Sequence, residues 1–360
     1  MKQIAEAPFT GLFLLTVLLV IPLGCLDTIE IDLPQHDQST RLVIQGVAER
    51  SDHAYRFFVE VSKTEKLTDF LKDEREDADI EILYNDQAII SLQNGSDYSI
   101  EIDSFHLLYG GSPESSLFNI RVKVGDSTFE SISQPIFKVP EGASLKIKYE
   151  EREELNDEEN VITQPYVKLL VTGPVTNSNN QRVSYRWDVS GVYLFREVIW
   201  TLDTSYDPRI CYVSDPVSQN QVNIVSSGTV LGDTIRDYEI HETTADHRFA
   251  TGYYYTVVQK SINEQAANYW KEISNSIDRS GTIYDPPAGI VSTNIRQTAG
   301  STVDLLGFFY TAGVDTIRLL STRDETGNQP HLCAHKIVSD VCCDCILIRN
   351  STYDKPAYWQ

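Results

Sequence analysis

Cysteine and histidine side chains, which form disulfides or bind metal ions, gather near the end of the sequence. They are Cys333, Cys342, Cys343 and Cys345, with His331 and His335 beside them. A tetrahedral zinc site needs ligands that converge on the ion, whereas the adjacent Cys342 and Cys343 would point to opposite faces of a strand. The cluster therefore predicts structural disulfides, and a zinc site is the alternative interpretation.

Cys211 brings the number of cysteines after residue 25 to five, of six in the whole chain. Outside the cytoplasm thiols tend to pair, and five cysteines allow at most two disulfides and leave one thiol over. A bond between the adjacent Cys342 and Cys343 is strained, so we expect them to have separate partners or one of them to stay free. The rest of the connectivity is open.

His241 and Glu242 begin the one stretch that resembles a catalytic metal motif. In the zinc-protease pattern H-E-x-x-H, two histidines four residues apart face one metal ion, and here Ala245 takes the place of the second histidine. The sequence has no G-x-S-x-G turn and no glycine-rich phosphate loop. We therefore predict no catalytic residues, no metal and no cofactor, and a protein that is not an enzyme.

The sixth cysteine, Cys25, follows an apolar segment of residues 12–21. This segment is shorter than the roughly 20 residues of a membrane-spanning helix and has the length of a secretory signal. Gly24 directly before Cys25 resembles the lipobox of bacterial lipoproteins, in which the chain is cut before an acylated cysteine; Pro22 departs from that pattern. We expect a signal peptide over residues 1–24, lipidation of Cys25 and an acidic tether over 25–40. An ordinary signal sequence with an incidental cysteine is the alternative.

The charge balance limits the kinds of partner. The chain has 52 acidic and 30 basic residues, a formal net charge of −22. Nucleic-acid affinity depends on Lys and Arg that neutralise phosphates, and attraction to anionic lipids needs basic clusters. We therefore predict no nucleic-acid partner, and membrane attachment through the acyl chains alone.

The elements that must position these residues are mostly strands. Short segments of alternating polarity with turn residues between them fill residues 41–140 and predict an immunoglobulin-like or transthyretin-like β-sandwich. The charge run inside 141–165 predicts an acidic linker. Residues 166–360 predict a second β-rich domain with a helix near 262–278, closing strands at 303–311 and 316–322, and a Cys-rich tail. The fold class is therefore mainly β.

Two aromatic residues are candidates for contact with a partner. Trp200 and Tyr206 lie at the start of and within a loop-like stretch, residues 201–208, whereas Trp187 and Trp270 lie on apolar faces typical of a core. Exposed aromatic side chains can stack on sugars or anchor a protein partner. We therefore place Trp200 and Tyr206 on a partner-binding surface.

Several segments together resemble one family. They are the acidic stretch 26–34, Leu42-Val43-Ile44-Gln45-Gly46, Cys211, the stretch 261–270, Tyr284-Asp285-Pro286-Pro287, Gly307-Phe308-Phe309, Cys342-Cys343-Asp344-Cys345 and Lys355-Pro356-Ala357-Tyr358-Trp359. Their combination is similar to the DUF4249 lipoproteins of Bacteroidota. The resemblance implies an outer-membrane lipoprotein, often encoded beside a TonB-dependent receptor. The family has no settled activity, so the resemblance supplies no catalytic residues.

The functional hypothesis follows from these expectations. We expect a lipid-anchored accessory protein of the outer membrane, on the cell surface, that binds a nutrient or a TonB-dependent receptor and assists uptake. A position on the periplasmic side is the alternative location. A structural or adhesive envelope lipoprotein, or a surface hydrolase without a known motif, is the alternative function.

Overall fold

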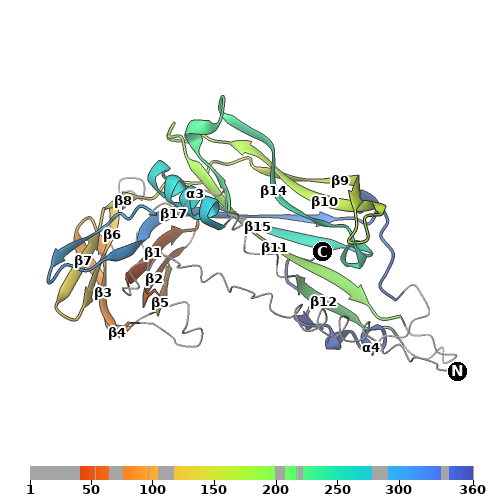
Figure 1. The fold of residues 1–360 in the computed structure, drawn as a ribbon, viewed down its shortest axis with the longest axis horizontal. Coiled ribbons are helices and arrows are strands. Elements are labelled where there is room, and N and C mark those ends of the chain that lie inside the picture. The colour runs from red at the N-terminus through yellow and green to blue at the C-terminus, as the bar shows by residue number, and fades with distance from the viewer. Residues whose placement is uncertain are drawn as a thin grey trace, which may run out of the picture. The chain divides into compact units, whose positions relative to one another are not determined.

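β-Strands make up most of the regular structure (Figure 1). The computed structural model describes residues 41–52, 54–64, 76–95, 97–103, 117–198, 207–215, 217, 222–277, 291–333 and 340–359. The strands are β1 (Leu42–Arg50), β2 (Ala54–Lys63), β3 (Ala78–Tyr84), β4 (Gln87–Gly95), β5 (Asp97–Asp103), β6 (Leu117–Val124), β7 (Ser127–Ser131), β8 (Gln134–Pro135), β9 (Ser144–Leu155), β10 (Val161–Pro174), β11 (Ser184–Arg196), β12 (Ile210–Asp215), β13 (Asn223–Val225), β14 (Thr234–Thr244), β15 (Tyr253–Ile262), β16 (Ile295–Ala299), β17 (Leu305–Ser321) and β18 (Ser351–Thr352). The helices are α3 (Glu264–Ile277) and α4 (Asp340–Cys343), with short 3-10 helices η3 (Ser227–Thr229), η4 (His247–Phe249), η5 (Asp324–Thr326) and η6 (Cys345–Leu347). The mainly β fold is as predicted.

The described strands form three sheets. A nine-stranded sheet has the order β18-β12-β11-β15-β17-β1-β2-β5, with β13 also paired to β11. A six-stranded sheet has the order β16-β7-β6-β3-β4, with β8 also paired to β6, and a three-stranded sheet has the order β14-β10-β9. All pairs but one are antiparallel: β1 runs parallel to β17, with Leu42 opposite Leu305 and Arg50 opposite Gly313.

This parallel pair joins the two predicted domains through one sheet. β1 belongs to the predicted sandwich of residues 41–140, and β17 to the predicted domain of residues 166–360. The sandwich core is buried between β1 and β2 on one side and β3 and β6 on the other, and Ile295 of β16 and Phe309 of β17 complete it. Residues 41–140 therefore do not form their sandwich alone, and no sequence periodicity could show which distant strand would cover the open edge of β1.

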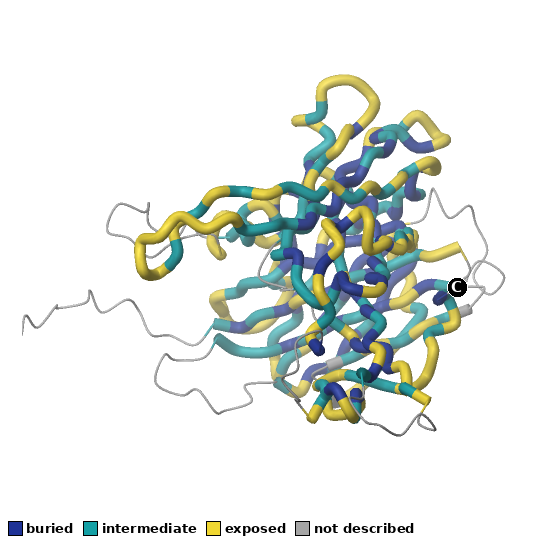
Figure 2. Tube along the Cα trace, turned by 90° about the vertical axis from the view of Figure 1, so that its right-hand side faces the viewer, coloured by how far each residue is buried: buried dark blue, intermediate teal, exposed yellow. Residues whose placement is uncertain are grey.

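A second core lies between the three-stranded sheet and the other half of the nine-stranded sheet. Alternate residues of β10 face alternate residues of β11 and β15, the pattern of two sheets packed face to face. Its largest fully buried side chains are Trp187, Tyr185, Tyr253, Tyr255, Phe195 and Phe249. Trp187 is thus a core residue, as its sequence context predicts. In Figure 2 the buried residues follow the facing strands, and exposed residues concentrate in turns.

The helix α3 covers a third cluster on the nine-stranded sheet. Its first turn begins after Asn263, whose side chain accepts a hydrogen bond from the Ala266 amide at 2.8 Å, as a helix N-cap does. Ala266, Ala267 and Tyr269 pack onto Phe308 and other residues of β17. The predicted helix near 262–278 is confirmed, and the 3.6-residue period of its apolar face explains why the sequence located it.

The prediction of an acidic linker over residues 141–165 was wrong, because this segment forms paired strands. Residues 141–165 contain β9 and the start of β10, paired from Thr172 opposite Ser144 to Val161 opposite Leu155. Lys168 of β10 holds the carboxylates of Glu150 and Glu239 at 3.3 and 2.7 Å, and Arg152 also pairs with Glu150. These cations offset the acidic charge that made the segment resemble a solvated linker.

The two predicted closing strands are one strand. β17 runs without a break for 17 residues, through the Gly313-Val314-Asp315 stretch that separates the two predicted strands. Phe309 lies in the sandwich core, Phe308 lies under α3, and Leu319 packs against the second core. One strand therefore contributes to all three clusters.

Candidate functional site

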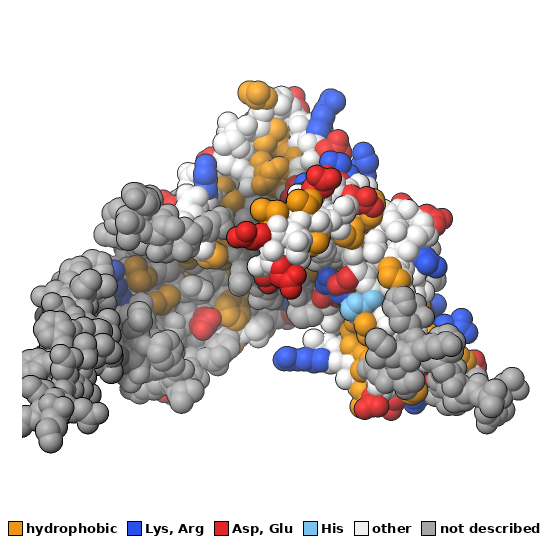
Figure 3. Space-filling model, turned by 45° about the vertical axis from the view of Figure 1, so that its right-hand side comes forward, with side chains coloured by type: hydrophobic (Ala, Val, Ile, Leu, Met, Phe, Trp, Pro, Cys, Tyr) orange, Lys and Arg blue, Asp and Glu red, His pale blue; other side chains and the backbone are white. Residues whose placement is uncertain are grey.

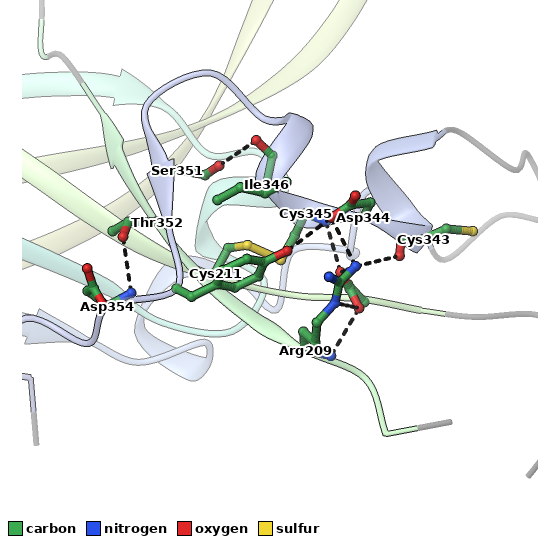
Figure 4. Close-up of a disulfide and its surroundings, with 11 residues drawn as sticks. Arg209, Cys211, Cys343, Asp344, Cys345, Ile346, Ser351, Thr352 and Asp354 are labelled. Atoms are coloured by element: carbon green, nitrogen blue, oxygen red, sulfur yellow. Dashed lines mark hydrogen bonds and ion pairs between the residues drawn. A yellow bond between two sulfur atoms is a disulfide. The ribbon is translucent and has the colours of Figure 1, made fainter. Parts of the chain in front are cut away.

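The cysteine-rich tail forms the two disulfides that the cysteine count allows. Cys211 of β12 is bonded to Cys345, and Cys333 is bonded to Cys342 of α4. Of the described cysteines only Cys343 has no disulfide, and it is exposed. In Figure 4 its sulfur points away from the Cys211–Cys345 bond. The prediction of structural disulfides is confirmed. Within the described ranges, no group of three or more His, Cys, Asp and Glu side chains is arranged to hold a metal ion.

A buried carboxylate holds this tail against β12. Glu197 accepts hydrogen bonds from the backbone amide of Cys345 at 3.0 Å and from the backbone amide of Arg209 at 3.0 Å. The Arg209 guanidinium lies 2.9 Å from Glu197 and 2.9 Å from Asp344, so it links β12 to the tail (Figure 4). Donors from both segments satisfy the buried charge, which is the arrangement of a structural clamp.

Three of the predicted site residues lie outside the described residues. These are the lipidation site Cys25 and the partner-binding aromatics Trp200 and Tyr206. Their predictions stand as sequence-based expectations.

A row of opposite charges crosses the nine-stranded sheet on the face that carries α3. Glu101 of β5 lies directly opposite Arg56 of β2, and Arg56 lies opposite Glu49 of β1. Beyond β17, Lys260 of β15 continues the row. Residues opposite each other in neighbouring strands point to the same face, so the register brings together charges that are more than 200 residues apart in the sequence.

The charges in this row are ion-paired, and those around Lys260 form a connected network. Arg56 lies 2.7 Å from Glu101, and the Lys260 ammonium reaches across β17 to Glu49 at 2.6 Å. The same ammonium lies 2.9 Å from Asp188 of β11, whose other oxygen is 3.0 Å from Arg186. Arg186 in turn stacks on Trp270 of α3, with its guanidinium carbon 3.8 Å from the ring centre. The network thus fixes Lys260 and Asp188 in position.

A pocket of about 350 Å³ lies over this network. Its described lining residues are Glu49, Ser51, Ala54, Arg56, Glu101, Asp188, Val258, Lys260, Val314 and Thr316. A smaller pocket of about 170 Å³ shares Ser51 and Val314 with it, but its Arg50, Gly313 and Asp315 alternate with the residues of the row and therefore belong to the opposite face of the sheet. We call the larger pocket the sheet groove. Its volume falls in the size range of small-ligand sites.

The electrostatics of the groove favour fixed charges over proton transfer. Burial alone would lower the pKa of Lys260, but Tyr310, Glu49 and Asp188 outweigh it and hold the pKa above its ordinary value. The hydrogen bond to Glu101 likewise raises the pKa of Arg56. Lys260 therefore keeps its proton at neutral pH and is not a nucleophile or a general base. The groove is suited to holding a charged ligand.

Sequence analysis did not find the groove. Each charged residue alternates with apolar residues in its own strand, which is the usual pattern of an outward-facing side chain. The signal lies in the strand order and register, above all in the β1–β17 pair that brings Glu49 near Lys260. No local spacing carries that information.

The β9–β10 hairpin is a second surface feature. β14 pairs with β10 from Tyr166 onward, so the part of the hairpin beyond Tyr166 has no third strand among the described residues. At its tip Leu155 and Val161 face each other across the pair and are 68% and 67% exposed, and Ile162 is also exposed. We call residues 151–164 the hairpin arm. Figure 3 shows apolar, acidic and basic side chains interspersed on one face of the molecule. The hairpin arm places exposed apolar side chains within an acidic segment, and exposed apolar patches can mark contact sites.

The fold and the groove together define a mainly β protein with a polar groove on its largest sheet. Residues 27–318 match the sequence model of the family described as Domain of unknown function (DUF4249), and the chain belongs to that family. The matched range contains every described residue that lines the groove, and Cys333, Cys342 and Cys345 lie after it. The resemblance seen in the sequence is confirmed at the level of the family.

No curated protein matches this sequence. Within the residues that the structure describes, no helix is both long and apolar enough to cross a membrane.

Proposed function

We propose that this protein is a lipid-anchored accessory protein of the outer membrane, which holds a small polar ligand in the sheet groove and assists a TonB-dependent receptor in taking it up. In this proposal acyl chains on Cys25 attach the protein to the membrane, on the cell surface. The tether then links the lipid to β1. Two or more acyl chains give a stable attachment, whereas one gives only a reversible one.

The sheet groove is the observation that carries the proposal. Lys260, Glu49 and Asp188 come from three strands and are held by direct ion pairs. Preorganised opposite charges around a pocket favour binding, because the protein does not have to reorganise them when a ligand arrives. The protonated Lys260 favours binding over nucleophilic chemistry in the same pocket.

The hairpin arm supplies the surface for the receptor in this proposal. An exposed apolar tip costs a lone protein solubility, and such patches commonly mark contact sites with other proteins. Leu155 and Val161 sit at the end of two paired strands, so they can enter a pocket of a neighbouring protein without movement of the sheets. The charged residues around them would form the polar rim of that contact.

Copurification from native membranes tests this function. The tagged full-length protein is expressed in its own host, extracted in mild detergent under conditions that preserve known receptor–lipoprotein pairs, and its partners are quantified by mass spectrometry. We expect one TonB-dependent receptor at near-stoichiometric amounts. Recovery of no outer-membrane receptor would contradict the proposal.

A further inference from the structure

We propose that the sheet groove binds ligands that carry primary ammonium groups, such as a short lysine-containing peptide or a polyamine. This inference rests on the proposed function for its setting and adds the chemical class of the ligand.

Carboxylates outnumber cations in the groove. The acidic residues among its described lining residues are Glu49, Glu101 and Asp188, against the cations Arg56 and Lys260. This excess of negative charge favours cationic ligands over anionic ones.

The cations of the groove are largely used within the protein. Lys260 is bound to Glu49 and Asp188, and Arg56 to Glu101. An ammonium has three hydrogen atoms to donate and a guanidinium five, whereas each carboxylate has about four lone-pair positions to accept with. The carboxylates Glu49, Glu101 and Asp188 therefore keep more unused hydrogen-bonding capacity than Lys260 and Arg56, and they accept hydrogen bonds from a ligand.

Exposure favours the carboxylate in the pair at the centre of the groove. The side chain of Asp188 is 41% exposed and that of Lys260 is 12% exposed, while Arg56 and Glu101 are exposed to similar extents. A ligand that enters the groove meets the oxygens of Asp188 before it meets the nitrogen of Lys260.

The lining also argues against sugars. Sugar sites commonly place an aromatic ring beneath the pyranose. The described residues that line the groove include no Trp, Tyr or Phe. The hydroxyls of Ser51 and Thr316 remain as neutral partners for a peptide or amine chain, and Val258 and Val314 supply short apolar contacts for methylene groups.

Titration calorimetry on the purified full-length chain in detergent at low salt tests the inference. The probes are trilysine and spermidine, which separate a peptide source of ammonium groups from a polyamine source, with triglutamate and trialanine as comparison ligands. We expect trilysine or spermidine to bind with an affinity that falls as salt rises, and neither comparison ligand to bind. Absence of binding by both amines would overturn the inference.

Matched variants locate the site. Asp188→Asn should weaken amine binding about tenfold, the loss expected for one charge-assisted hydrogen bond. Glu239→Gln is the control, because that carboxylate is 40% exposed and paired with a lysine as Asp188 is, yet does not line the groove. Glu101→Gln, at an exposed position, provides a second groove variant should Asp188→Asn disturb folding. If the control and the groove variants weaken amine binding equally, the amines are attracted nonspecifically to an acidic protein. That result would contradict the assignment of the binding site to the groove.

The copurification experiment and the calorimetric titration test different claims, so a negative result in one does not decide the other. Amine binding without receptor recovery would remove the accessory function and keep the ligand class. Receptor recovery without amine binding would keep the function and remove the ligand class.

Discussion

At the scale of single residues, the second core depends on one glycine. Gly191 of β11 lies beneath the Tyr253 hydroxyl, and a Cβ atom at this position would be 1.9 Å from that oxygen. The hydroxyl donates a hydrogen bond to Asp215 at 2.8 Å, and Arg248 lies 2.6 Å from the same carboxylate oxygen. A side chain at Gly191 would therefore displace a buried ring together with its polar partners.

The variant Gly191→Ala should lower the free energy of unfolding by about 1–3 kcal/mol, the usual cost of overpacking a core. Urea unfolding followed by tryptophan fluorescence measures it. Gly228→Ala is the control, because the nearest atom to its added Cβ lies at 3.5 Å, an ordinary contact. Equal stability of Gly191→Ala and the wild type would show that Tyr253 can move at little cost.

Glu264 gives a prediction about pH. Its burial raises its pKa, but hydrogen bonds from Ser226, Ser184 and Ser227 outweigh this and hold the pKa below its ordinary value. A carboxylate with a lowered pKa stabilises the fold above the pKa of the unfolded chain, about 4.3, and loses that contribution as the pH falls through the folded pKa.

The stability difference between the wild type and Glu264→Gln should therefore be positive at pH 7 and shrink below pH of about 4. We expect less than about 1 kcal/mol at pH 7, because the side chain is largely open to solvent screening. Chemical unfolding at several pH values measures it. A difference that stays constant from pH 7 to pH 3 would mean that the serines bind both forms of Glu264 equally well.

At the scale of elements, substitutions at the tip of the hairpin arm should change partner contact without changing folding stability. Leu155 and Val161 are exposed, and substitutions at such surface positions usually change stability by less than about 0.5 kcal/mol. Leu155→Ser with Val161→Ser should therefore fold like the wild type and recover much less receptor from native membranes. Unchanged recovery would assign the contact to another surface.

Ile147→Ser is the matched control on the same hairpin. Ile147 also lies in β9, but it packs against the second core. This variant should lower the unfolding temperature, whereas the tip variant should not. The pair of variants shows whether lost recovery follows from the tip itself or from a damaged hairpin.

The same elements show how much the sequence could predict. The period of α3 and the alternation of β1, β2 and β11 are local, so their existence and type were predictable. The hairpin was missed because its acidic run matched a linker in composition, while Lys168, one of the cations that neutralise Glu150, lies on the partner strand. The groove was missed because strand order and register depend on tertiary packing. The cysteine count fixed the number of disulfides but not their pairing.

At the scale of the whole molecule, a short stretch of sequence separates the proposed lipidation site from the first strand. The 16 residues from Cys25 to Arg41 span at most roughly 55 Å when fully extended. If Cys25 is acylated, as we propose, the start of β1 stays within that distance of the membrane surface.

The variant Cys25→Ser should move the protein from the membrane fraction to the soluble fraction, because the acyl chains have nothing to replace them. Fractionation followed by immunoblotting measures this, with Cys343→Ser as a control that removes an exposed thiol but no anchor. Retention of Cys25→Ser in membranes would contradict lipidation as the means of attachment.

The parallel pair of β1 and β17 has a consequence for biosynthesis. β1 lies between β2 and β17 in the finished sheet, and the ribosome makes β2 directly after it but makes β17 only near residue 305. During that interval one edge of an apolar strand lacks its neighbour and can pair with the wrong chain. Contacts between residues so far apart also form slowly. The nascent protein should therefore depend on chaperones until its last quarter is made.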